Sequence, residues 1–292
     1  MRFITLLLLL TILISCQTNQ ESKVEKEQVS PRDLSNGFKE YWFSGQAEIS
    51  SYTLEQDRYG EMRPGTAVLI FVTEDFLPDV QVKSNKKTEE TQSVLKLNKT
   101  KNFNTGIYPY SIMSSVFYPL EEKNHALKVT QSIQEWCGHV YAQLNNRNDF
   151  QIKSHSYFEG EADQEYNHTK TNLEDEIWTQ IRINPVDLPL GEIEIFPSME
   201  YSRLRHKEFK AYKAIASLDQ KESTFEYCIK YSGLDRKLTI WFESVFPYQI
   251  THWKEQIGES TTQATFMKKI QSAYWSKNQN NDAHLRDSLE LN

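Results

Sequence analysis

The run FEYCIKY at residues 225–231 decides the fold of this chain, because its side chains alternate between two classes with a period of two. Large apolar residues occupy one phase, and smaller or charged residues occupy the other: Phe225, Tyr227, Ile229 and Tyr231 against Glu226, Cys228 and Lys230. Successive side chains of a β-strand point to opposite faces of a sheet. The run therefore predicts a strand with one buried face.

The same alternation recurs on both sides of that run. The phased residues downstream are Leu238, Ile240 and Phe242, then Tyr248, Ile250 and His252, and then Ala264, Phe266, Lys268 and Ile270 within residues 262–275. Residues 210–218 supply a similar pattern upstream. Short connections favour antiparallel neighbours, so we expect a five-stranded antiparallel meander.

The first half of the chain is also rich in strand patterns. Runs near residues 127–133, 140–144 and 150–152 predict a second meander, with turn residues between them. The apolar run AVLIFV at residues 67–72 predicts a strand covered on both faces. Apolar residues change phase near Ser50 and Ser51, which predicts a β-bulge there.

One clear helix pattern interrupts the strands. Leu173, Ile177 and Ile181 are spaced at i, i+4 and i+8, which places them on one helix face. Asn172 is a candidate N-cap, and Pro185 ends the segment. We therefore expect a helix over residues 173–183, and a second short helix over residues 282–289.

These patterns predict a mostly β protein of the β-rich α+β class. We expect a large curved antiparallel sheet, or an open barrel, with one helix packed on its concave side and a short C-terminal helix. No βαβ alternation or glycine-rich phosphate loop is present, which disfavours a nucleotide-binding α/β domain. The globular body spans residues 36–292, either as one sheet or as halves at 36–190 and 191–292.

The first residues predict export and lipidation. Residues 1–15 carry an early arginine and a short apolar run, as a secretory signal peptide does. The sequence Leu13-Ile14-Ser15-Cys16 resembles a lipobox, which implies cleavage before Cys16 and its modification with diacylglycerol and a further acyl chain such as palmitate. The alternatives are an ordinary signal peptide cut nearby or an uncleaved anchor. Residues 16–35 are polar and predict a flexible tether, and Gln17 favours the outer membrane.

Composition limits the partners. The chain has 33 Lys and Arg against 40 Asp and Glu, a net charge of −7, so nucleic acid is not expected as a partner. Besides Cys16, Cys137 and Cys228 remain. An exported compartment permits a disulfide between them, and two free thiols are the alternative. No spacing resembles a zinc or iron–sulfur site, and we expect no cofactor.

Several stretches together resemble a family of uncharacterised bacterial envelope lipoproteins, often labelled "septum formation inhibitor Maf". They are the lipobox cysteine, YWFSGQAE (residues 41–48), QEWCGH (134–139), GEADQEY (160–166), LEDEIWTQIR (173–182), SRLRH (202–206) and AYW (273–275). True Maf proteins are cytoplasmic nucleotide pyrophosphatases with an α/β fold and a motif of the type Ser-x-Ser-Pro-Arg-Arg. Here Ser30-Pro31-Arg32 is followed by Asp33 after an export signal, so the resemblance implies an envelope lipoprotein without that activity.

Three clusters are candidates for chemistry. Trp136, Cys137 and His139 form one; Cys137 and His139 share a strand face if the chain stays extended, whereas a tight turn with Trp136 in the core is the alternative. Acids at alternate positions from Glu159, namely Glu161, Asp163 and Glu165, are weak calcium candidates, or else form a solvated loop.

The third cluster is basic. Arg203, Arg205 and His206 are suited to grip a phosphate or carboxylate. The alternative is that the arginines pair with Glu192, Glu194 or Glu200 across the sheet.

From these features we expect a lipid-anchored envelope protein that is not an enzyme and that binds a hydrophobic small molecule or an envelope partner protein. The aromatic meander would form either its core or a concave apolar groove. An envelope hydrolase using Cys137, His139 and Glu165 is one alternative, and a structural subunit of an envelope complex is another.

Overall fold

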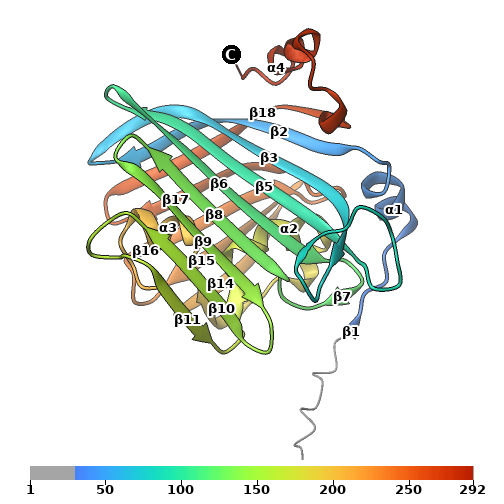
Figure 1. Ribbon diagram of the computed structural model, residues 1–292, viewed down its shortest axis with the longest axis horizontal. Helices are drawn as coiled ribbons and strands as arrows, with labels where there is room; N and C mark the ends of the chain where they lie inside the picture. Colours follow the sequence, from blue (N-terminus) through green and yellow to red (C-terminus); the bar gives the residue numbers. More distant parts are fainter. Residues whose placement is uncertain (1–29, 292) are drawn as a thin grey trace, which may run out of the picture.

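The computed structural model describes residues 30–291, and most of these residues lie in β-strands (Figure 1). The predicted signal peptide, the predicted lipidation of Cys16 and most of the predicted tether lie outside this range. The helices are α1 (Asn36–Trp42), α2 (Glu174–Ile183), α3 (Met199–Leu204) and α4 (His284–Asp287), with 3-10 turns η1 (Pro185–Asp187), η2 (Tyr274–Ser276) and η3 (Asn280–Ala283).

The strands are β1 (Ser30–Pro31), β2 (Ala47–Arg58), β3 (Glu61–Leu77), β4 (Val82–Lys83), β5 (Gln92–Thr105), β6 (Tyr108–Pro119), β7 (Glu122–Lys123), β8 (Lys128–Glu135), β9 (Gly138–Asn146), β10 (Phe150–Ser156), β11 (Gln164–His168), β12 (Asn172–Leu173), β13 (Gly191–Phe196), β14 (Tyr212–Lys221), β15 (Thr224–Tyr231), β16 (Arg236–Glu243), β17 (Ile250–Ile257) and β18 (Ser260–Ser272). One large sheet contains all of these strands except β1 and β7, which pair with each other.

The large sheet curves into an open barrel (Figure 1). Its order is β11-β10-β9-β8-β6-β5-β3-β2-β18-β17-β16-β15-β14-β13-β12, so β11 and β12 are its two edges. Within residues 30–291, no ladder joins these edges. Aromatic side chains bridge the gap instead: Phe196 of β13 lies 6.1 Å from Phe150 of β10 and 5.2 Å from His168 of β11, measured between ring centroids. The predicted fold class is confirmed.

Helix α2 fills the inside of the barrel. Nine of its ten residues are buried, and Ile177 and Ile181 belong to the main hydrophobic core together with Tyr227 and Ile229 of β15. This confirms the predicted helix and the predicted buried face of residues 225–231. The N-cap is Leu173 rather than Asn172, whose side-chain amide donates to the Glu194 carbonyl oxygen instead.

The β-bulge predicted in β2 is wrong. Strand β2 pairs with β3 without a register shift from Glu48 to Arg58, and the bulge lies in the neighbouring strand, between Phe266 and Lys268 of β18. The change in apolar phase has another cause. Ala47 and Ile49 face outward and are covered by a second small core that includes Leu289, which follows α4. The apolar residues on the outer face of β2 therefore produce the change of phase in the sequence, without a β-bulge in that strand.

The predicted alternation of inward-facing and outward-facing side chains is also wrong for the middle of β17. The register between β16 and β17 shifts between Trp241 and Phe242, which leaves Thr251 without a cross-strand partner. His252 consequently turns outward and stacks on Trp241 at 4.2 Å, while Trp253 is buried at 2% exposure. The predicted five-stranded meander of β14 to β18 is otherwise confirmed.

The barrel has two different ends (Figure 1). The α1 end carries α1, the loop around β4, and the β1–β7 pair at which the described chain begins. The α3 end carries α3 and the turns that follow β2, β5, β8, β10 and β17. Among the described residues, no helix has the length and apolar character needed to cross a membrane.

Candidate functional site

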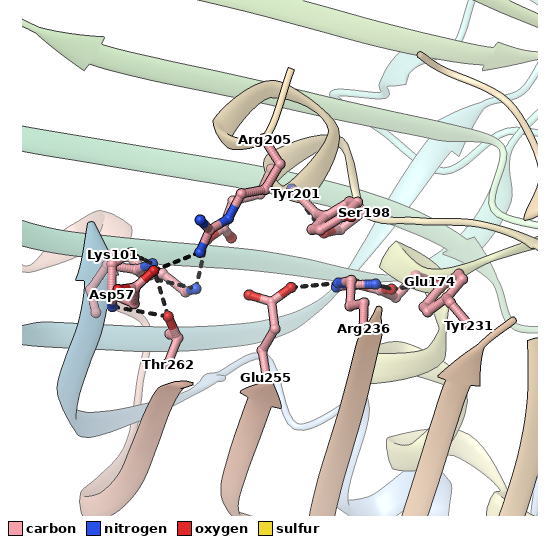
Figure 2. Close-up of polar contacts among 12 residues, drawn as sticks. Asp57, Lys101, Glu174, Ser198, Tyr201, Arg205, Tyr231, Arg236, Glu255 and Thr262 are labelled. Atoms are coloured by element: carbon pink, nitrogen blue, oxygen red, sulfur yellow. Dashed lines mark hydrogen bonds and ion pairs between the residues drawn. The ribbon is translucent and has the colours of Figure 1, made fainter. Parts of the chain in front are cut away.

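A network of buried charges lies inside the barrel beneath α3 (Figure 2). Arg236 of β16 donates to both carboxylate oxygens of Glu174 in α2, one of them at 2.7 Å, and its Nε donates to Glu255 of β17 at 2.6 Å. Tyr231 of β15 donates its hydroxyl to the same Glu174 carboxylate. Buried charges are costly unless they are paired in this way, so the network fixes the first turn of α2 to three strands.

Two lysines extend the network to α3. Lys99 and Lys101 of β5 lie 3.5 and 2.6 Å from the Glu200 carboxylate, measured from Nζ. Burial alone would raise the pKa of Glu200, but the two lysines outweigh it and lower the pKa to about 2. The nearby Asp175 accepts a hydrogen bond from the Met199 backbone N–H, and burial raises its pKa to about 6. Ion pairs between Glu200 and the two lysines therefore hold the inner face of α3 against β5.

A small polar cavity lies within this network. Its volume is about 30 Å³, which is room for one or two water molecules. Its charged lining residues include Lys99, Lys101, Glu174, Glu200, Arg236 and Glu255. Because the space is small and charged, it does not suit an acyl chain.

A larger pocket opens above the cavity at the α3 end, and we call it the mouth pocket. It has an open volume of about 400 Å³, and its lining includes Asp57, Arg58, Tyr59, Tyr110, Phe158, Arg203, Arg205 and His206. Asp57, Arg58 and Arg205 line both the mouth pocket and the inner cavity. Arg205 donates to the Asp57 carboxylate at 2.6 Å (Figure 2), so this ion pair borders both spaces.

A second open space, the seam cleft, lies between the β10–β11 connection and the segment that follows α3. Its volume is about 480 Å³, and its lining includes Phe158, Glu161, Gln164, Tyr166, Arg203, His206, Lys207 and Phe209. Glu161 accepts from Arg203 at 3.3 Å and lies 2.7 Å from Nδ1 of His206. Phe158, Arg203 and His206 line both the cleft and the mouth pocket, so the two spaces are neighbours.

The basic residues predicted as a cluster therefore line these two spaces, but their positions in the fold and their ion-pair partners differ from the prediction. Arg203 lies in helix α3 and Arg205 is its C-cap, so the two do not share a strand face. Glu192, Glu194 and Glu200 are not their partners; Arg203 pairs with Glu161 and Arg205 with Asp57. The helix was missed because it has only six residues, too few to show a helical period.

The acidic run does not form the calcium site considered above. Residues 157–163 turn instead of extending, so the acids do not share a face. Each of the three candidate acids instead lies beside a basic side chain. Glu161 contacts Arg203 and His206, Asp163 lies 3.2 Å from His155, and Glu165 lies 3.0 Å from Lys153. Within the part of the chain that the structure describes, no group of three or more metal-ligating side chains is present.

Trp136 is exposed rather than buried in the core as one interpretation had it. It occupies the β8–β9 turn, with 68% of its surface exposed, 6.4 Å from the Tyr108 ring. The neighbouring Cys137 is exposed, and a hydrogen bond from its side chain to Glu135 raises the pKa of the thiol. A raised pKa reduces the reactive thiolate. His139 is also exposed, and no hydrogen bond joins it to Cys137 in residues 30–291.

Cys137 and Cys228 are both free cysteines in the structure, and Cys228 is partly buried in β15. The aromatic side chains of the last meander point into the core against α2. A mainly apolar cavity between β8 to β10 and α3 has a volume of only about 10 Å³. The concave side of the sheet is filled by α2, and we find no apolar groove there among the described residues.

Several residues of the site were not found by sequence reasoning. Asp57 and Arg58 end β2 and Tyr59 follows it, and no apolar alternation marks these three residues in the sequence. A signal was present for the two inner lysines. Extending the phase of Leu95 and Leu97 by two and four residues places Lys99 and Lys101 on the same inward face. Charged residues in a buried phase are expected to be paired or functional.

Comparisons with known proteins give a likeness of fold and no family match. No protein-family model and no curated protein matches this chain. Among solved structures, the chain is similar to a beta-barrel-like protein of a domain of unknown function, DUF1849, from Brucella abortus. The sequences are 7% identical, the alignment covers 77% of this chain and 98% of that chain, and the TM-score is 0.48.

Proposed function

We propose that this protein is a lipid-anchored, non-catalytic binding protein of the bacterial cell envelope, held to the outer membrane through Cys16. The lipobox-like sequence and the polar tether support the anchor. The resemblance to envelope lipoproteins supports the compartment. We do not propose the Maf pyrophosphatase activity, because the Maf motif is incomplete and the observed sheet is antiparallel apart from the β12–β13 pair rather than α/β.

The single observation that carries this proposal is the position of the open pockets relative to the start of the described chain. Ser30 pairs with Lys123 at the α1 end (Figure 1), whereas the residues that line the mouth pocket and the seam cleft belong to the α3 end. A chain anchored ahead of Ser30 would present its binding end away from the bilayer. Open volumes of about 400 and 480 Å³ are in the range of small-molecule sites.

An envelope partner protein is a second candidate for the same end. The tips of four turns there expose large side chains, namely Tyr59, Ile107, Trp136 and Tyr157, with exposed fractions of 60 to 85%. Tyrosine and tryptophan, which supply three of these four side chains, are enriched in protein interfaces. We do not propose the hydrolase alternative, since within residues 30–291 no hydrogen bond or ion pair joins Cys137, His139 and Glu165, and Glu165 is held by Lys153.

The anchor is tested by fractionating cells that express the full-length chain or its Cys16→Ser variant, and by metabolic labelling with palmitate. We expect label and membrane association in the wild type and neither in the variant. Equal membrane association without label would refute the anchor.

The binding function is tested by native mass spectrometry of residues 17–292, purified gently from an exported form. We expect a reproducible additional mass that dissociates as a small molecule. A bare monomer mass would favour the partner protein, and cross-linking in the envelope would then identify it through Trp136 or Tyr157.

A further inference from the structure

We infer that the mouth pocket binds a phosphate-type oxyanion carried on a planar or apolar body. This inference rests on the proposed binding function and names its ligand class. The chain has a net charge of −7, yet Arg58, Arg203, Arg205 and His206 converge on this pocket, whose lining has a single carboxylate, that of Asp57. A partly enclosed pocket with an excess of one charge concentrates ions of the opposite charge.

Arg58 is the arginine of this pocket whose charge is not paired with a carboxylate among the described residues. Its guanidinium donates to the Leu204 carbonyl oxygen at 2.9 Å and to the hydroxyls of Tyr59 and Tyr110 at 3.2 Å. In the described part of the chain it has no ion-pair partner, and its Nε has no hydrogen-bond acceptor. A guanidinium carries five N–H donors in a fork that matches an oxyanion, so the charge of Arg58 is available for a ligand.

The other two arginines are held by carboxylates that occupy the place of a ligand oxyanion. Asp57 accepts from Arg205 at 2.6 Å, and Glu161 accepts from Arg203 at 3.3 Å. The Arg205 side chain is 31% exposed, so it has room to exchange Asp57 for a ligand. The buried Nε of Arg203 also lacks an acceptor. Ligand binding is therefore a competition with Asp57 and Glu161.

Aromatic rings define the rest of the ligand. The Arg58 guanidinium lies 4.2 Å from the centroid of the Tyr59 ring, and the Arg203 guanidinium lies 4.3 Å from that of Phe158. With Tyr110, these rings give the pocket apolar walls beside its cationic groups. An inorganic phosphate ion would fill only a small part of about 400 Å³, so a larger body attached to the oxyanion would bury more surface and bind more tightly.

The test is isothermal titration calorimetry of the purified mature protein with inorganic phosphate, phenyl phosphate and dihexanoyl phosphatidylglycerol. We expect phenyl phosphate to bind more tightly than inorganic phosphate, with an affinity that falls as salt is added. Tighter binding of the short-chain lipid than of phenyl phosphate would identify a lipid headgroup as the source of the oxyanion, and weaker binding would identify a soluble ester. Failure of all three probes to bind the folded protein would overturn the inference.

Variants make the test specific. Arg58→Gln should weaken phenyl phosphate binding by about tenfold or more, the loss expected for a charge-assisted hydrogen bond. Arg147→Gln is the matched control, because it removes the same charge at the α1 end, where Arg147 donates to the Asp79 carbonyl oxygen. If Arg58→Gln does not fold, Arg58→Lys keeps the charge without the fork and should also bind more weakly.

Equal affinity of the folded Arg58 variants and the wild type would contradict the inference. Cys16→Ser should leave this binding unchanged. Failure of the anchor is therefore distinguishable from failure of the anion site.

Discussion

Arg182 of α2 and Glu48 of β2 form a bidentate ion pair inside the barrel, with N···O distances of 2.6 and 2.7 Å and no exposure of either side chain. The guanidinium also lies 5.1 Å from the Trp42 ring centroid and 4.8 Å from that of Phe71. Its Nε donates to the Pro247 carbonyl oxygen at 2.8 Å. This one side chain therefore ties the last turn of α2 to β2 and to the β16–β17 connection.

Breaking this pair should destabilise the protein strongly. Glu48→Gln leaves the Arg182 charge buried without its counter-ion, and we expect a loss of about 3–5 kcal/mol in the free energy of unfolding. Denaturant unfolding monitored by tryptophan fluorescence measures it. The control is Glu61→Gln, which removes the exposed carboxylate of a pair with Arg63 and should cost less than about 1 kcal/mol. Similar losses in the two variants would show that the buried pair does not hold α2.

Asp175 should make stability depend on pH in the opposite sense to an ordinary paired carboxylate. Its pKa is raised from 3.8 to about 6 by burial, so the folded state binds its proton more tightly than the unfolded chain. Its contribution to stability is therefore full below pH 3.8 and is lost as the pH rises through about 6.

Asp175→Asn removes the titrating carboxyl group and therefore the loss of stability that its ionisation causes as the pH rises. We expect the variant to be more stable than the wild type by roughly 1–3 kcal/mol at neutral pH, with the difference vanishing near pH 4. Unfolding curves across this pH range measure the difference. Asp219→Asn, at an exposed position of β14, should change stability little at any pH. A constant difference between Asp175→Asn and the wild type would refute the assignment.

The fold could be predicted where the residues obey the usual rule that apolar side chains face inward. Residues 225–231 and the helix of residues 173–183 follow it, and both were predicted correctly. Strand β2 breaks the rule, because Glu48 faces inward to meet Arg182 while Ile49 faces outward under the C-terminal segment. Both partners lie more than a hundred residues away in the chain, so no local pattern could show the true phase.

The candidate site was predictable only in part, for the same reason. Arg203, Arg205 and His206 were noticed because they are neighbours in sequence. Their partners were not noticed, because Asp57 and Glu161 are distant in the sequence and reach Arg205 and Arg203 only in the folded chain. The role of Arg58 depends on the hydroxyls of Tyr59 and Tyr110, which come from the β2–β3 turn and from strand β6.

The thiol of Cys137 should react slowly for an exposed cysteine. The adjacent Glu135 carboxylate raises its pKa, which lowers the thiolate fraction at neutral pH. We expect Glu135→Gln to increase the rate of labelling by an aromatic disulfide reagent at neutral pH, measured in a Cys228→Ser background. Glu165→Gln, on β11 and paired with Lys153, is the control and should leave the rate unchanged. A slower rate in Glu135→Gln would contradict the predicted direction.

The most direct test of the anion site is to shift its affinity in both directions. Asp57→Asn removes the one carboxylate in the mouth pocket and releases Arg205, whereas Arg58→Gln removes a free cation. For phenyl phosphate, we predict that Asp57→Asn binds roughly three- to tenfold more tightly than the wild type and Arg58→Gln more weakly. Damage to the fold would weaken binding in both variants. Equal affinities in all three proteins, or weaker binding in Asp57→Asn, would contradict an anion site in the mouth pocket.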